Sequence, residues 1–130
     1  MRVKSIHRER ETEKVRVLIV DDSKDIRDRL VKLCELVPNV EVIGQAADGC
    51  EGLQAIRELE PDLVTLDLGM PKMGGIEVLQ VLKAKENKSQ IIVLSSFTEP
   101  VYQKCFELGA AYVLDKTKDI DRLLKILREA

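Results

Sequence analysis

The chain has 130 residues, of which 45% are hydrophobic and 34% charged, and its formal net charge is -2. This length accommodates one domain with one buried core. The acidic balance argues against a basic face for nucleic acid, and the aromatic content of 3% argues against a platform for stacked bases. No apolar run approaches the ~20 residues that a membrane-spanning helix needs.

The cysteines and the N-terminus indicate a protein of a reducing compartment. Cys34, Cys50 and Cys105 are odd in number and far apart, so we expect small apolar side chains rather than disulfides or zinc ligands. Residues 1–13 are charged and lack the apolar segment of a signal peptide. We therefore expect a charged extension over 1–13, a single domain over 14–130, and a cytoplasmic location.

After the extension, compact apolar runs alternate with amphipathic segments. The run VRVLIV at 15–20 is rich in β-branched residues, which is typical of a buried strand. Apolar residues at helical spacing follow it, until Pro38-Asn39 ends the helix. The predicted strands are 15–20, 40–46, 62–67, 91–95 and 111–115. The predicted helices are 23–37, 48–60, 76–86, 99–109 and a final helix whose inward stripe is Ile120, Leu123, Leu124 and Leu127.

This alternation predicts a single α/β domain with a parallel five-stranded sheet and helices on both faces. The strands are continuous apolar runs because both faces of such a sheet are buried. Ligands of such sheets bind at the carboxyl ends of the strands. The residues that follow each strand are therefore the candidates for chemistry.

Polar side chains end four of the five predicted strands. Each one alone has an ordinary explanation, such as a helix cap or a solvated charge, and Asp48 after the second strand is interpreted as a helix N-cap. Their occurrence over four strand ends favours a site. They are Asp21 and Asp22 after the first strand, Asp67 after the third, Ser95 and Ser96 after the fourth, and Asp115 and Lys116 after the fifth.

Three carboxylates at one sheet edge repel one another and require a cation. Mg²⁺ suits them, because it binds one or two carboxylates, keeps waters and shares phosphate oxygens. No His or Cys stands beside them in the sequence, which disfavours zinc. A hydroxyl and an ammonium complete the groups that a transferring phosphoryl needs. The sequence thus predicts a Mg²⁺ site where one carboxylate becomes an aspartyl phosphate.

The motifs VLIVDDS, DLVTLDLGMPKMGGIEVL, IIVLSS and GAAYVLDK resemble the receiver domain of bacterial two-component response regulators, the CheY-like superfamily. The resemblance covers roughly residues 14–130. It implies a flavodoxin-like fold with strand order 2-1-3-4-5 and five helices. It also implies a signalling module that accepts a phosphoryl group in a phosphorelay, catalyses its own phosphorylation and dephosphorylation, and turns over no metabolite.

The resemblance assigns the metal-binding residues one by one. Asp67, in the stretch PDLVTLDLGMPKMGG, is expected to be the phosphoacceptor and a metal ligand. Asp22 would bind Mg²⁺ or Mn²⁺ directly, and Asp21 mainly through water. The backbone carbonyl of Gly69 would be the remaining protein ligand.

The resemblance also assigns the groups that contact the phosphoryl and the partners. Ser95, with Ser96 beside it, and Lys116 would bind the phosphoryl oxygens, and the helix 99–109 and the strand 111–115 would repack. The implied donor is a sensor histidine kinase or a phosphotransfer protein. An output partner or a phosphorylation-dependent homodimer would read the change, with no nucleic acid or membrane bound by this domain.

The chain departs from the family pattern at three places. Val113 stands where an aromatic residue is frequent, and the neighbouring Tyr112 is expected to point to the opposite face. Thr117 replaces the proline that commonly follows the lysine. Gly69 and Phe97 stand at the two positions that flank the path of hydrolytic water in the family. Gly69 has no side chain to orient that water, and Phe97 is large enough to shield the phosphoryl group. They predict slow self-dephosphorylation.

Two other functions are compatible with an acidic strand edge, and particular residues argue against each. An aspartyl phosphatase of the haloacid dehalogenase type would place a second Asp two residues after the nucleophile, where Gly69 stands. A receiver that binds proteins without phosphorylation would not need the intact acids, hydroxyl and lysine.

Overall fold

The computed structural model of the chain describes residues 14–96 and 100–130. In this part of the chain, five strands alternate with five helices, as predicted. The strands are β1 (Val15–Val20), β2 (Val40–Ala46), β3 (Leu63–Leu66), β4 (Gln90–Ser95) and β5 (Tyr112–Asp115). The helices are α2 (Lys24–Glu35), α3 (Gly49–Leu59), α4 (Gly75–Ala84), α5 (Pro100–Glu107) and α6 (Ile120–Glu129).

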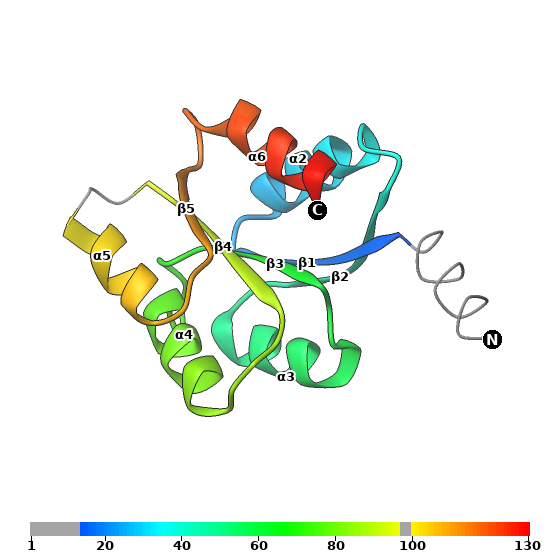
Figure 1. The fold of residues 1–130 in the computed structure, drawn as a ribbon. Coiled ribbons are helices and arrows are strands. Elements are labelled where there is room, and N and C mark those ends of the chain that lie inside the picture. Colours follow the sequence, from blue (N-terminus) through cyan, green and yellow to red (C-terminus); the bar gives the residue numbers. More distant parts are fainter. Residues whose placement is uncertain (1–13, 97–99) are drawn as a thin grey trace, which may run out of the picture.

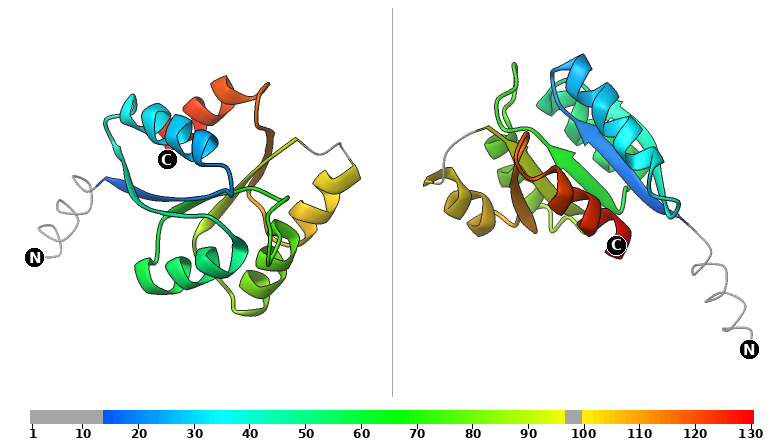
Figure 2. Two further views of the ribbon diagram at one scale, coloured as in Figure 1. Left: turned by 180° about the vertical axis from the view of Figure 1, so that it is seen from behind. Right: turned by 90° about the horizontal axis from the view of Figure 1, so that it is seen from above.

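The strands form one parallel sheet in the order β2-β1-β3-β4-β5, which confirms the predicted strand order 2-1-3-4-5. Helices α2 and α6 cover one face of the sheet, and α3, α4 and α5 cover the other (Figures 1 and 2). All five strands run in the same direction, so their carboxyl ends share one edge.

The core consists of two apolar clusters, one on each face of the sheet. On the face of α2 and α6, Leu30 and Leu127 pack with Ile19 of β1. On the other face, Ile56 and Leu79 pack with Leu66 of β3. Side chains of one strand thus alternate between the two clusters, which explains the continuous apolar runs in the sequence.

The element boundaries agree with the predictions to within a few residues. The bounds of β1 and β2 are those predicted, whereas β3 is shorter than 62–67 and ends one residue before Asp67. The predicted helix 99–109 begins one residue before α5 and extends two residues past its last residue, Glu107; residue 99 lies outside the described part. Of the predicted inward stripe of α6, Leu123 and Leu127 are buried in the core, and the half-buried Leu124 packs against the same cluster. Ile120 is half-buried and does not belong to that cluster. Within the described residues, no helix combines the length and apolar character needed to cross a membrane.

Candidate functional site

Asp21, Asp22 and Asp67 meet at the carboxyl edge of the sheet, where the sequence predicted a cation site. Asp21 follows β1, and Asp67 follows the neighbouring strand β3. The Asp67 N–H donates to the carbonyl of Val20, the last residue of β1, at 3.0 Å. One carboxylate oxygen from each acid lies within 4.8 Å of the others. Asp21 and Asp67 are buried, and Asp22 is exposed.

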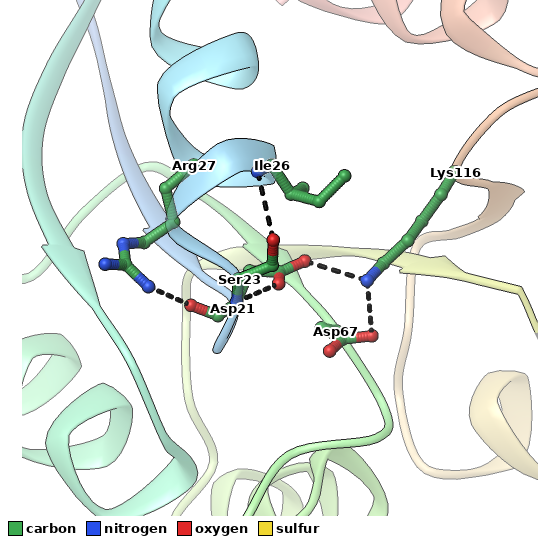
Figure 3. A network of polar contacts seen from close by, with 6 residues as sticks. All are labelled: Asp21, Ser23, Ile26, Arg27, Asp67 and Lys116. Carbon is green, nitrogen blue, oxygen red and sulfur yellow. Dashed lines mark hydrogen bonds and ion pairs between the residues drawn. The ribbon is translucent and has the colours of Figure 1, made fainter.

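Lys116 inserts its ammonium between the two buried acids. Its Nζ lies 3.0 Å from Asp21 Oδ2 and 3.1 Å from Asp67 Oδ1, and its side chain is only 16% exposed (Figure 3). The Lys116 N–H donates to the Ser95 carbonyl at 3.1 Å, which joins the ends of β4 and β5 beside the acids. The lysine therefore pairs with two of the three acids at this edge.

The loop after β1 is held by the side chains and main chain of two residues, Ser23 and Arg27, that were not predicted from the sequence. Ser23 donates its N–H to Asp21 Oδ1 at 2.9 Å, and its hydroxyl accepts from the Ile26 N–H as the N-cap of α2. Arg27 donates from Nη1 to the Asp21 carbonyl at 2.7 Å (Figure 3). The Ser23-x-x-Ile26 spacing could have indicated the cap, but Arg27 has no sequence signal, since a helix cation is usually solvated.

Burial and the neighbouring charges shift the pKa values of both Asp67 and Lys116. Burial raises the pKa of the Asp67 carboxyl above its ordinary value, and the nearby Asp21 charge raises it further. The Lys116 ammonium and a backbone hydrogen bond from Gly69 oppose this rise without cancelling it. Burial alone would lower the pKa of Lys116, but its pairs with Asp21 and Asp67 outweigh burial and raise it.

The donor set fits a hard divalent cation. Three ionised carboxylates and one ammonium leave a local charge of -2 in this cluster. All three donors in the group are carboxylate oxygens, the ligands that Mg²⁺ and Mn²⁺ prefer, and the group contains no His or Cys. A divalent cation with oxygen ligands would neutralise the charge that Lys116 leaves.

The other predicted residues occupy different positions around this edge. Ser95 is buried at the end of β4, whereas Ser96 is exposed. Gly69 is exposed two residues after Asp67, in the loop between β3 and α4. Phe97 lies outside the described residues.

Asp48 and Asp115 serve local turns rather than the acidic cluster. Asp48 accepts from the Glu51 N–H at 2.8 Å, which confirms the predicted N-cap of α3. Asp115 Oδ1 accepts from the N–H and the hydroxyl of Thr117 and from the Lys118 N–H, each at 2.8–2.9 Å. These bonds lower the pKa of Asp115 and shape the turn that carries Lys116.

Val113 and Tyr112 point to opposite faces of β5, as predicted. Val113 is buried in the cluster that includes Cys105, and Tyr112 is exposed. Tyr112 is therefore not placed to pack inward at the position where the family often has an aromatic residue.

Comparison with protein-family models matches residues 17–128 to the response regulator receiver domain. Among curated relatives, the chain is 39% identical over 117 residues to a protein-glutamate methylesterase/protein-glutamine glutaminase of Geobacter sulfurreducens, covering 89% of the chain and 32% of that protein. It is 38% identical over 118 residues to the transcriptional regulatory protein LiaR of Bacillus subtilis, covering 89% of the chain and 56% of that protein. The chain thus spans about a third of the first relative and about half of the second.

Solved structures show the same similarity in three dimensions. The response regulator domain of Thermotoga maritima CheB superposes with a TM-score of 0.83 at 32% identity, over 91% of this chain and 96% of that one. The CheX-CheY-BeF3-Mg complex of Borrelia burgdorferi contains a chain with a TM-score of 0.82 at 29% identity, over 90% of this chain and 89% of that one. The family match, these relatives and the acidic edge agree, and the chain belongs to the response regulator receiver domain family of two-component signalling.

Proposed function

We propose that the chain accepts a phosphoryl group on Asp67 from a phosphohistidine in a two-component phosphorelay. The single observation that carries this proposal is the placement of Lys116, within 3.1 Å of both Asp21 and Asp67 at an edge where three carboxylates converge. An ion-paired lysine alone would serve only to stabilise the fold. A lysine that leaves a net charge of -2 beside an exposed acid fits a site that takes a divalent cation and then a phosphoryl group.

The metal ligands in this proposal are Asp22, Asp67 and the Gly69 carbonyl. Asp21 has one oxygen on Lys116 and the other on the Ser23 N–H, which supports an indirect role for it through water. A bound Mg²⁺ would offset the carboxylate charge and the charge that develops on the phosphoryl oxygens. The presence of Mg²⁺ in the Borrelia complex, which contains a chain of the same fold, supports the choice of this cation.

The chain's own groups then perform the transfer. The Asp67 carboxylate attacks phosphorus as the phosphorus–nitrogen bond of the donor breaks, and the histidine leaves with the electron pair of that bond. Lys116 holds the Asp67 carboxylate before transfer and pairs with a phosphoryl oxygen afterwards. Ser95 donates its hydroxyl to the phosphoryl, with Ser96 beside it, and its movement would pull on the loop that leads to α5.

Labelling with a small phosphodonor tests the proposal. Acetyl phosphate with Mg²⁺ should add one phosphoryl group per chain to the wild type and none to Asp67→Asn, as measured by intact mass. Chelation of the divalent cation should abolish the addition. A wild-type chain that stays unmodified while it binds a receiver partner would instead favour a protein-binding module, and size-exclusion chromatography of the labelled sample would test for a phosphorylation-dependent dimer.

A further inference from the structure

The loop between β3 and α4 carries Gly69, and its far side rests on the N-terminus of α3. The Gly49 N–H donates to the Met73 carbonyl at 3.1 Å. Asp48, the N-cap of α3, has its Oδ2 3.5 Å from Lys72 Nζ. These two contacts join α3 to the loop that carries Gly69. The helix contributes no proposed metal ligand, whereas the loop contributes the Gly69 carbonyl.

Gly49 permits this contact because it has no side chain. A Cβ at position 49 would lie 2.2 Å from the Met73 oxygen and 2.8 Å from the Met73 carbonyl carbon. These are backbone atoms, so a rotamer change cannot relieve the clash, and either the loop or the helix must move. Alanine has a higher helix propensity than glycine. The glycine at position 49 is therefore explained by its contact with the loop rather than by the requirements of the helix.

The loop is also fixed where it leaves β3. A displacement of Met73 by a side chain at position 49 would therefore move the rest of the loop as well. The Gly75 N–H donates to the Leu68 carbonyl at 3.0 Å, and a Cβ at position 75 would lie 2.5 Å from the backbone carbonyl oxygen of Asp67. Lys72 adopts a left-handed backbone conformation with φ of 66°. Residues 68–74 thus form a tight arch between the strand end and α3, with Gly69 near its start.

We propose that Gly49 and Asp48 are positioning residues for the divalent cation, which they serve by holding the arch 68–74 so that the Gly69 carbonyl faces Asp22 and Asp67. This inference rests on the proposed function, because it assumes that Gly69 ligates the cation. Residues that hold a metal ligand in place typically change metal affinity about 10- to 100-fold when they are altered.

The test compares two identical substitutions on one helix. Gly49→Ala adds a methyl group against the arch, whereas Gly52→Ala adds one against the Val20 side chain, where the nearest atom would be 2.9 Å away. Mg²⁺ affinity is measured by titration of the unphosphorylated protein, and thermal stability is measured in parallel without metal. We expect Gly49→Ala to bind Mg²⁺ at least about tenfold more weakly than the wild type, and Gly52→Ala to bind within about twofold of it even if both lose stability. Equal Mg²⁺ affinity in the two variants would overturn the proposal.

A second variant covers the case in which Gly49→Ala does not fold. Lys72 is 69% exposed, so Lys72→Met should fold as the wild type does. By charge alone, removal of a cation from the loop that carries Gly69 should tighten Mg²⁺ binding. If the pair with Asp48 holds the arch, Mg²⁺ binding should weaken about twofold instead. Tighter or unchanged binding would contradict a positioning role.

The Mg²⁺ titration of the wild type distinguishes failure of the positioning role from failure of the proposed function. A wild-type chain that does not bind Mg²⁺ at all would refute the proposed function. Normal binding in the wild type and in Gly49→Ala would refute the positioning role alone.

Discussion

The Lys116 ammonium lies 3.1 Å from the Asp67 carboxylate and, on its other side, 3.0 Å from Asp21. One cation thus compensates two buried anions from different strands of the sheet. Because removal of the lysine would leave two buried carboxylates uncompensated, the lysine is both a structural and a chemical element of the site.

Replacement of Lys116 by methionine should therefore destabilise the chain. We expect the free energy of unfolding at neutral pH to fall by about 3 kcal/mol without metal, and Mg²⁺ to restore part of this loss by supplying positive charge. Urea denaturation with and without Mg²⁺ measures both effects. Lys118→Met, at an exposed neighbouring position, should change the free energy of unfolding by less than about 0.5 kcal/mol. A Lys116→Met chain as stable as the wild type without metal would contradict this reading of the site.

The raised pKa of Asp67 predicts how stability depends on pH. A carboxyl whose pKa is higher in the folded chain binds more protons there than in the unfolded chain, so the free energy of unfolding falls as pH rises. The fall begins near the unfolded value of about 3.9 and ends above the folded pKa. Asp67→Asn removes this dependence. Without metal, the Asp67→Asn chain should become increasingly more stable than the wild type over this window and remain so at neutral pH.

Denaturation of the two proteins from pH 4 to pH 8 without divalent cations measures the difference. A neutral-pH stability of Asp67→Asn below that of the wild type would show that the pair with Lys116 outweighs burial and repulsion from Asp21.

Much of this arrangement could be predicted from the sequence. The apolar runs indicated a parallel sheet because both of its faces are covered, and the acids that end β1 and β3 were expected at one edge because parallel strands end there. That β1 and β3 are neighbours was implied by the family resemblance alone. Arg27 and the contact between Gly49 and Met73 could not be predicted. Both involve a main-chain carbonyl that every residue possesses, so no residue pattern marks them.

The boundaries that differed have local causes. The strand β3 ends at Leu66, the last residue that pairs with β1 and β4, although the Asp67 N–H still donates to the Val20 carbonyl. In α6, the predicted stripe differs only at Ile120, which begins the helix beside the turn of Asp115 and is half-buried.

Thr65 offers a test of the core beneath the site. Its hydroxyl is buried in β3 and has no hydrogen-bond partner. Among the fully buried side-chain nitrogen and oxygen atoms of residues 14–96 and 100–130, it is the only one without a partner. Thr65→Val replaces this hydroxyl with a methyl group of similar size and should raise the free energy of unfolding by about 1 kcal/mol. Thr65→Ser keeps the hydroxyl, loses a methyl group and should lower it. Chemical denaturation of both variants measures the effect, and a destabilised Thr65→Val would mean that the hydroxyl is hydrogen-bonded in solution.

The lifetime of the phosphorylated state is predicted to depend on Phe97. Gly69 offers no side chain to orient water, and we propose that Phe97 shields the phosphoryl group, so self-dephosphorylation should be slow. Phe97→Ala should shorten the half-life by about tenfold, which corresponds to about 1.4 kcal/mol in the barrier. Phe106→Ala, on the exposed side of α5, should leave the half-life unchanged. Equal half-lives of the Phe97→Ala and wild-type proteins would remove the shielding argument.

The most direct test of the central claim locates the phosphoryl group on the chain. Borohydride reduces an aspartyl phosphate to homoserine, which marks the modified residue permanently. After labelling with acetyl phosphate and Mg²⁺, reduction and peptide mass spectrometry should place one homoserine at position 67 and none at Asp21 or Asp22. Homoserine at another acid, or label that survives in Asp67→Asn, would contradict the assignment of Asp67 as the phosphoacceptor.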